Sequence, residues 1–228
     1  MTSLIAAAVF FLLIHLAVSG TPLRNAIVRV TGDGAYMGLF SLASVAGIVW
    51  IAMAYADARG LGSTYWDAGV AGRHASLLIQ LLAVLLIVPG LTTRNPTSVK
   101  QEGALERPDV VTGMLRVTRH PFLWGVAIWA AGHLLVNGDT PGLILFGTML
   151  FLAVSGTFSI DAKRGRALGT TYKAFEAQTS NVPFGAIASG RQRLSPGEIG
   201  WWRILLAVAV WAIVLFAHRH LFGVDPLA

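Results

Sequence analysis

The sequence contains no cysteine, and charged residues make up only 12% of its 228 residues. The absence of cysteine excludes disulfides, thiolate metal ligands and cysteine nucleophiles. Soluble domains carry about 25% charged residues, so the low charge content indicates that much of the surface faces lipid. Basic residues at the ends of membrane spans explain the net charge of +6 better than nucleic-acid binding does, and no nucleic-acid partner is expected.

Apolar residues gather in six runs, most of them long enough to cross the hydrocarbon core of a bilayer as a helix. We therefore predict an all-α polytopic membrane protein, with a single integral-membrane domain over residues 1–228 and about six spans. The first run ends in small residues, as a signal peptide does. No basic segment precedes it and it is longer than a usual signal core, so we expect it to be retained. The predicted spans are residues 2–20, 36–56, 75–91, 122–136, 141–160 and 201–222.

Turn-forming residues predict where several helices begin and end. The segment Asn137–Pro141 separates the fourth and fifth runs and predicts a tight helical hairpin. Thr140 is expected to cap the next helix, and Pro141 suits its first position. Pro89-Gly90 predicts the end of the third helix.

The basic residues are distributed unevenly between the two sides of the predicted bundle. Fourteen of the 17 Lys and Arg residues fall between the first and second, third and fourth, or fifth and sixth runs, counting Arg203 in the first turn of the sixth. The positive-inside rule then places these loops in the cytoplasm and both termini in the periplasm of a bacterial inner membrane. The two long basic loops are expected to contain short interfacial helices, and the lipid bilayer is the expected partner of the whole domain.

Two histidines lie well inside predicted spans, His15 in the first and His133 in the fourth, whereas His218 and His220 stand at the far end of the sixth. Ionisable residues within a membrane are costly and tend to mark functional sites. A pair of imidazoles on different helices, without a cysteine or carboxylate cluster, favours the axial ligands of a haem iron over a zinc site. Their depths differ by roughly 9 Å along the helices, so His120 is a further candidate partner for His15, and His74 or His218 for His133.

The surroundings of these histidines also suit a porphyrin. Arg24 and Arg119 at the basic side could pair with propionates. The alternatives are ordinary helix packing for the aromatic residues and, for Arg119-His120-Pro121, a basic anchor at the lipid headgroups. Aromatic side chains near the histidines could enclose the ring: Phe10, Phe11, Trp124 and Trp129. The sequence has no Walker loop, HExxH motif or nucleophile elbow.

The segment Arg119–Asp139 resembles the signature of the NnrU family, and so does the stretch from His15 to Arg24. This family also contains 15-cis-zeta-carotene isomerases, and the tail Thr179–Phe184 is similar to that longer form. The resemblance implies a multi-span inner-membrane protein that binds haem b through His15 and His133, with Ala130 where the isomerases have a cysteine. It implies a role accessory to nitrite or nitric oxide reduction, or in redox or nitric oxide sensing, with reductase components as partners.

Two alternative activities remain open at this stage. The first is a haem-dependent cis–trans isomerase acting on an apolar polyene such as 15-cis-zeta-carotene. The second rests on Arg119-His120-Pro121, Gly125 and Tyr172, which resemble the core of membrane methyltransferases of the isoprenylcysteine carboxyl type that use S-adenosylmethionine. Lys163-Arg164 stands where those enzymes have an acidic pair, so this likeness implies a shared fold more than a shared activity.

Overall fold

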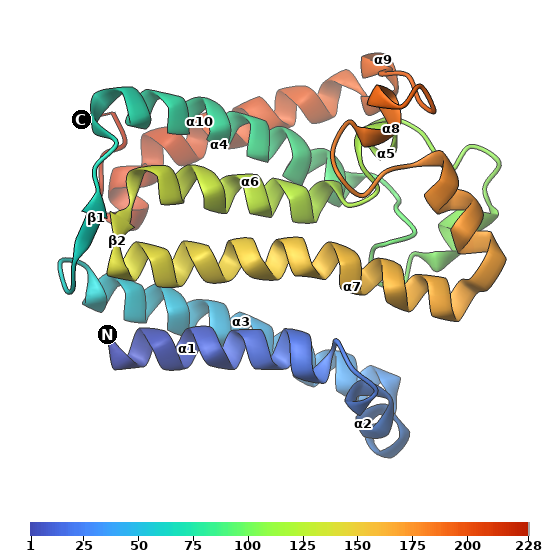
Figure 1. The fold of residues 1–228 in the computed structure, drawn as a ribbon, viewed down its shortest axis with the longest axis horizontal. Helices are drawn as coiled ribbons and strands as arrows, with labels where there is room; N and C mark the ends of the chain where they lie inside the picture. The colour runs from blue at the N-terminus through green and yellow to red at the C-terminus, as the bar shows by residue number, and fades with distance from the viewer. Residues whose placement is uncertain (228) are drawn as a thin grey trace.

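The structure, a computed structural model, describes residues 1–227 as an almost entirely helical bundle. Its long helices run side by side along a common axis, with α7 between α6 and α1 (Figure 1). This arrangement confirms the predicted all-α membrane architecture. The long helices are α1 (Thr2–Leu12), α3 (Asp33–Ala58), α4 (Gly69–Thr92), α6 (Pro121–Val136), α7 (Thr140–Gln178) and α10 (Trp201–Phe222).

Each predicted apolar run corresponds to one of these helices, but they differ in length. Four of them, α3, α4, α7 and α10, are long and apolar enough to cross a membrane. The first run forms α1 and a π-helical segment, η1 (Leu13–Val18), which is followed by α2 (Leu23–Thr31) at an angle of 83°. Counting this bent pair as one span gives up to five. The 16-residue α6 is shorter, as its apolar run predicted.

Short helices gather at one end of the bundle, which we call the basic end because the two long basic loops form it. They confirm that short helical segments interrupt these loops, and Figure 1 shows them beside the far end of α7. The other end carries both termini (Figure 1). The short helices of the loops are η2 (Glu102–Glu106), α5 (Met114–Val117), α8 (Gly185–Ala188) and α9 (Pro196–Ile199).

The hairpin between α6 and α7 is present, although its cap differs from the prediction. Asp139, not Thr140, caps α7, because its carboxylate accepts a hydrogen bond from Gly142 N at 2.8 Å. Thr140 instead contacts the α3–α4 connection, where its hydroxyl accepts from Ser63 N at 3.1 Å. A short antiparallel pair, β1 (Thr64–Trp66) with β2 (Gly138–Asp139), joins the two connections and had no signal in the sequence.

The third helix does not end at Pro89 as predicted. It continues to Thr92, and Thr93 N donates to the carbonyl of Pro89 at 2.9 Å. Proline removes only its own N–H, and its carbonyl can still accept from the next turn. The helix therefore reaches the basic end, where Gly90 lies against the backbone of Phe122.

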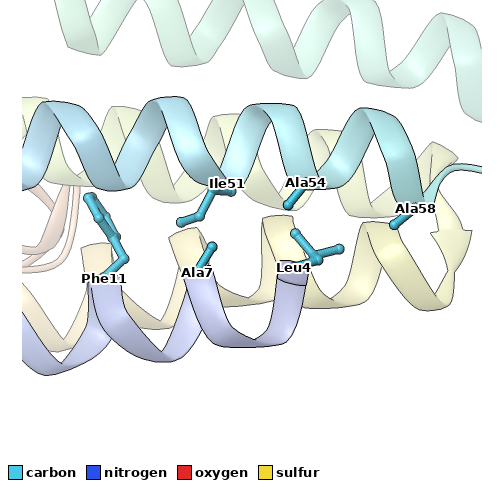
Figure 2. Close-up of a cluster of buried hydrophobic side chains, with 6 residues drawn as sticks. All are labelled: Leu4, Ala7, Phe11, Ile51, Ala54 and Ala58. Carbon is cyan, nitrogen blue, oxygen red and sulfur yellow. The ribbon is translucent and has the colours of Figure 1, made fainter. Parts of the chain in front are cut away.

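The apolar contacts hold α1 against α3 and α7. Figure 2 shows small and large side chains alternating along the α1–α3 seam, which allows the two helices to approach closely. On the outer faces large apolar residues stay exposed, among them Leu42 at 69% and Phe216 at 72%. Such faces suit contact with lipid chains. The seam is built from Leu4, Ala7, Phe11, Ile51, Ala54 and Ala58.

Candidate functional site

The last turn of α6 carries His133 to a point where three helices meet. Its ring stacks on Phe146 of α7, with ring centres 4.7 Å apart, and lies 4.8 Å from Trp129 of α6. Its Nδ1 lies 3.0 Å from the Trp129 carbonyl and 3.0 Å from the amide nitrogen of Gln80 on α4. We call His133, Gln80, Trp129 and Phe146 the His133 site.

Gly132 allows α4 to approach α6 closely enough for Gln80 to reach His133. A Cβ at this position would lie 2.5 Å from Gln80 Nε2 and 2.7 Å from Ile79. Ser76, one turn earlier on α4, donates to the Gly132 carbonyl at 2.8 Å. The absence of a side chain at residue 132 therefore fixes the geometry of the amide–imidazole contact.

His15 occupies a different environment, in the π-helical segment η1. Its Nδ1 lies 2.8 Å from the Phe11 carbonyl, and its ring packs between Phe11 at 4.3 Å and Phe40 of α3 at 5.1 Å. Within residues 1–227, the Nε2 atoms of His15 and His133 have no hydrogen-bond partner. Each imidazole is thus oriented by its own helix with one nitrogen turned away from it.

Helix α7 passes close to both histidine regions, so its residues show how far apart these regions lie along the bundle. Phe146 touches His133, while Lys163 donates to the carbonyl of Ser19, one turn after His15. These two α7 residues are about 17 residues, or roughly 25 Å, apart. Ser19 lies about 6 Å along the chain beyond His15, so the backbones at His15 and His133 lie at different levels of the bundle.

A porphyrin iron would need both nitrogens at bonding distance, about 2 Å for imidazole ligands of metals. His15 and His133 as the axial ligands of one haem iron therefore stay a prediction. Among the described residues no group of three or more His, Asp or Glu side chains could hold a metal ion. The predicted propionate partners are also engaged: Arg24 pairs with Asp33 at 2.8 Å, and Arg119 pairs with Asp161 at 2.6 Å.

A second constellation lies at the basic end, around the carboxylate of Asp161 on α7. Arg119 donates to it from Nε at 2.9 Å and from Nη2 at 2.6 Å. His120 Nε2 contacts it at 2.8 Å, and the Tyr172 hydroxyl donates at 2.7 Å. Asn181 donates from its amide at 2.9 Å. We call Asp161, Arg119, His120, Tyr172 and Asn181 the Asp161 cluster; Arg119 and His120 are buried.

A break in α7 makes this cluster possible. Gly169 has φ 56° and ψ −129°, a conformation that residues with a Cβ rarely adopt, and α7 turns back there (Figure 1). Without the break, Tyr172 would lie roughly 16 Å along the helix from Asp161. With the break, the tyrosine returns to the carboxylate, and Phe175 and Leu115 pack behind it.

The loop before α6 is fixed to the rest of the basic end by backbone contacts. The Arg119 carbonyl accepts from Asn95 Nδ2 and from Thr97 Oγ1, each at 3.0 Å. Arg119 N donates to the Ser180 carbonyl at 2.9 Å. These contacts hold Arg119 and His120 toward Asp161. Among the five residues of the Asp161 cluster, only His120 has a buried polar side-chain atom without a partner, Nδ1, within residues 1–227.

The remaining predicted residues fall into the two constellations or outside both. Trp129 belongs to the His133 site, while Trp124 donates to the Asn181 side chain at 3.3 Å beside the Asp161 cluster. His218 contacts the Val224 carbonyl at 2.8 Å near the end of α10. His74 is exposed at the start of α4. The structure therefore brings His120, Arg119 and Trp124 together, and separates them from His15 and His133.

Sequence reasoning missed Asp161 and Gln80, although both carried a signal. Asp161 is the first charged residue after the fifth apolar run, and Gln80 is the only amide side chain in the third. A polar side chain bordering or interrupting an apolar run usually has a buried partner. Tyr172 and Asn181 had no comparable signal, because their approach to Asp161 depends on the break at Gly169.

The fold and the His133 site define a multi-pass α-helical membrane protein with a histidine held among aromatic side chains. The chain belongs to the NnrU protein family, whose model matches residues 3–226. It is 26% identical over 218 residues to a chloroplastic 15-cis-zeta-carotene isomerase of Zea mays. It is 25% identical over 221 residues to the corresponding isomerase of Arabidopsis thaliana. These matches cover 92% and 93% of this chain but only 58% of each relative. No solved structure matches the chain significantly.

Proposed function

We propose that this protein isomerises a cis double bond of a linear, apolar polyene inside the bilayer, at the His133 site. The observation that carries the proposal is a histidine held among aromatic rings on α6 and α7, in a chain similar along 92% of its length to a 15-cis-zeta-carotene isomerase. The chain spans only 58% of that relative, so the activity is proposed here and not transferred.

The chemistry of the substrate agrees with this location. A polyene hydrocarbon dissolves among lipid chains and can approach an apolar helical bundle from the membrane, where faces such as those of α3 and α10 are exposed. The partly exposed aromatic ring of Trp129 suits contact with a conjugated chain. A cis–trans isomerisation adds and removes no atoms, so the site needs no opening for water or a co-substrate.

The test is conversion of zeta-carotene with a 15-cis double bond by the full chain in proteoliposomes kept in the dark. The protein is produced with a full supply of haem, and products are separated by chromatography. We expect conversion by the unmodified protein and a reduction of at least about tenfold by His133→Ala, equivalent to about 1.4 kcal/mol of barrier. His74→Ala removes an exposed histidine and should leave the rate unchanged. Conversion no faster than in empty liposomes would refute the proposal.

Haem b remains a prediction, and an absorption spectrum of the same preparation tests it. A Soret band is expected if haem is bound. His15→Ala and His133→Ala each remove one predicted axial ligand, so each should change that band. An unchanged band in both single variants would exclude these two histidines as ligands.

The other predicted roles depend on different observations. A role in nitrite or nitric oxide reduction predicts co-purification with reductase components. Methyl transfer predicts binding of S-adenosylmethionine that depends on Arg119 and His120. Two of the three guanidinium nitrogens of Arg119 already donate to Asp161, so its charge is compensated within the chain. This contact favours a structural role for Arg119.

A further inference from the structure

We infer that the basic end contains a binding site for a phosphoryl oxyanion, independent of the isomerase proposal. A cavity of about 350 Å³ lies between the end of α4, the 104–112 segment, α9 and the start of α10. We call it the arginine pocket. The side chains that define it are Arg94, Arg107, Arg203, Thr93, Asp109 and Glu198.

The acidic residues of the pocket pair with only one of its three arginines. Asp109 pairs with Arg107 at 3.1 Å. Glu198 points its carboxylate at Arg116, outside the pocket lining, at 2.7 Å and also accepts from Gly113 N at 3.0 Å. Within residues 1–227, Arg94 has no hydrogen-bond or ion-pair partner. Its positive charge therefore remains available to an anion.

Arg203 supplies a second, pre-positioned cation. Its guanidinium donates to the Thr92 hydroxyl and carbonyl, each at 3.2 Å, and to the Ile199 carbonyl at 2.9 Å. These acceptors are neutral, so they fix the group without compensating its charge, and two of its five N–H donors remain unused. The ring of Trp202 lies against it, 4.6 Å from its Cζ, and further restricts its orientation.

These features match a phosphoryl group, which presents several acceptor oxygens to donors on different sides. Two guanidinium groups and hydroxyl donors such as Thr93 surround one cavity, and arginine binds phosphate oxygens through paired N–H donors. The adjoining Trp201 and Trp202 are exposed at the start of α10, as is typical of tryptophans at the headgroup layer. The same chemistry would recognise an anionic lipid headgroup or free phosphate.

The proposal is tested by titration calorimetry on the full chain in neutral detergent. The probes are dioctanoyl phosphatidylglycerol, inorganic phosphate and dioctanoylglycerol, which lacks phosphate. We expect saturable binding of a phosphate-containing probe and none of dioctanoylglycerol. Binding of the lipid without binding of inorganic phosphate identifies a headgroup site. Equal affinity for both probes identifies a site for the free anion.

The matched variants are Arg94→Gln in the pocket and Arg193→Gln outside it. Both remove one positive charge from an exposed arginine of the basic end. Arg94→Gln should weaken binding about tenfold, as expected for one charge-assisted contact, and Arg193→Gln should leave it unchanged. Equal weakening by both variants would overturn the proposal, because general charge attraction would then explain the binding. Absence of saturable binding of either phosphate probe would also overturn it.

Discussion

The His133 site and the Asp161 cluster each contain a histidine of α6: His133 lies in its last turn and His120 is its N-cap. The hydrogen-bond partners of the two histidines differ. His133 has one nitrogen near an amide and a carbonyl, and otherwise touches aromatic rings. His120 instead points at a carboxylate that Arg119, Tyr172 and Asn181 also contact. The first site thus leaves one imidazole nitrogen, Nε2 of His133, without a hydrogen-bond partner within residues 1–227. The second site uses its polar groups on one another and stabilises the basic end.

Removing the central carboxylate of the Asp161 cluster should have the largest effect on stability. Asp161→Ala leaves His120 buried without its anion and leaves Arg119 with only the more distant carboxylate of Glu176, at 3.6 Å. Breaking a buried pair by removing one partner typically costs about 3–5 kcal/mol. We expect a large fall in the thermal unfolding midpoint in neutral detergent, followed by tryptophan fluorescence. Asp57→Ala removes an exposed acid of α3 and should leave the midpoint almost unchanged. If Asp161→Ala does not fold, Asp161→Asn keeps the shape of the side chain and should lower the unfolding midpoint less. Equal midpoints for all variants would show that the Asp161 cluster does not stabilise the basic end.

A methyl group at Gly132 should disturb the His133 site by steric pressure. Gly132→Ala puts a Cβ 2.5 Å from Gln80 Nε2, and overpacking of this kind typically costs about 1–3 kcal/mol. The unfolding midpoint should fall moderately, while isomerisation should fall more steeply because Gln80 and His133 separate. Gly147→Ala on α7 meets nothing within 4 Å and is the matched control. Equal activity in both variants would show that the close approach of α4 is not needed.

Replacing the amide of Gln80 should separate activity from stability. Gln80→Leu removes the contact to His133, but it also removes a buried amide oxygen that has no partner within residues 1–227. These effects oppose each other, so stability should change by less than about 1 kcal/mol. Isomerisation should fall, because the imidazole loses the group that helps to orient it. Unfolding midpoints and conversion rates are measured on the same preparations; an unchanged rate would assign Gln80 to packing alone.

The ion pair between Arg116 and Glu198 should make the smallest contribution to stability, and this contribution should depend on pH. Hydrogen bonds from Arg116 and from Gly113 N lower the pKa of Glu198 to about 2. Since the folded-state pKa lies below the unfolded value of about 4.3, the contribution to stability is present above pH ~4.3 and is lost as the pH falls toward 2. This partly exposed pair contributes about 1 kcal/mol or less. The midpoint difference between the unmodified protein and Glu198→Gln should therefore shrink on acidification; a constant difference would contradict the role of the pair.

The sequence predicted the parts of the fold that depend on local pattern. Apolar runs located the long helices, and Asn137–Pro141 located the α6–α7 hairpin. Features that depend on contacts between distant segments were missed or misplaced. Thr140 bonds to Ser63 and leaves the cap to Asp139, and Tyr172 reaches Asp161 only because α7 breaks at Gly169. For the candidate site, the importance of His133 was predictable from its place in an apolar run, whereas its amide partner is fixed by helix packing at Gly132.

The position of residues 1 and 227 at the same end of the bundle has a consequence for topology experiments (Figure 1). A chain that enters and leaves on one side crosses the bilayer an even number of times. Beside the four long apolar helices, α6 and the bent first segment would then either both count as crossings or both not count. Reporters fused to the two termini would then be located in the same compartment. Cleavage or labelling at the basic end would report the opposite compartment.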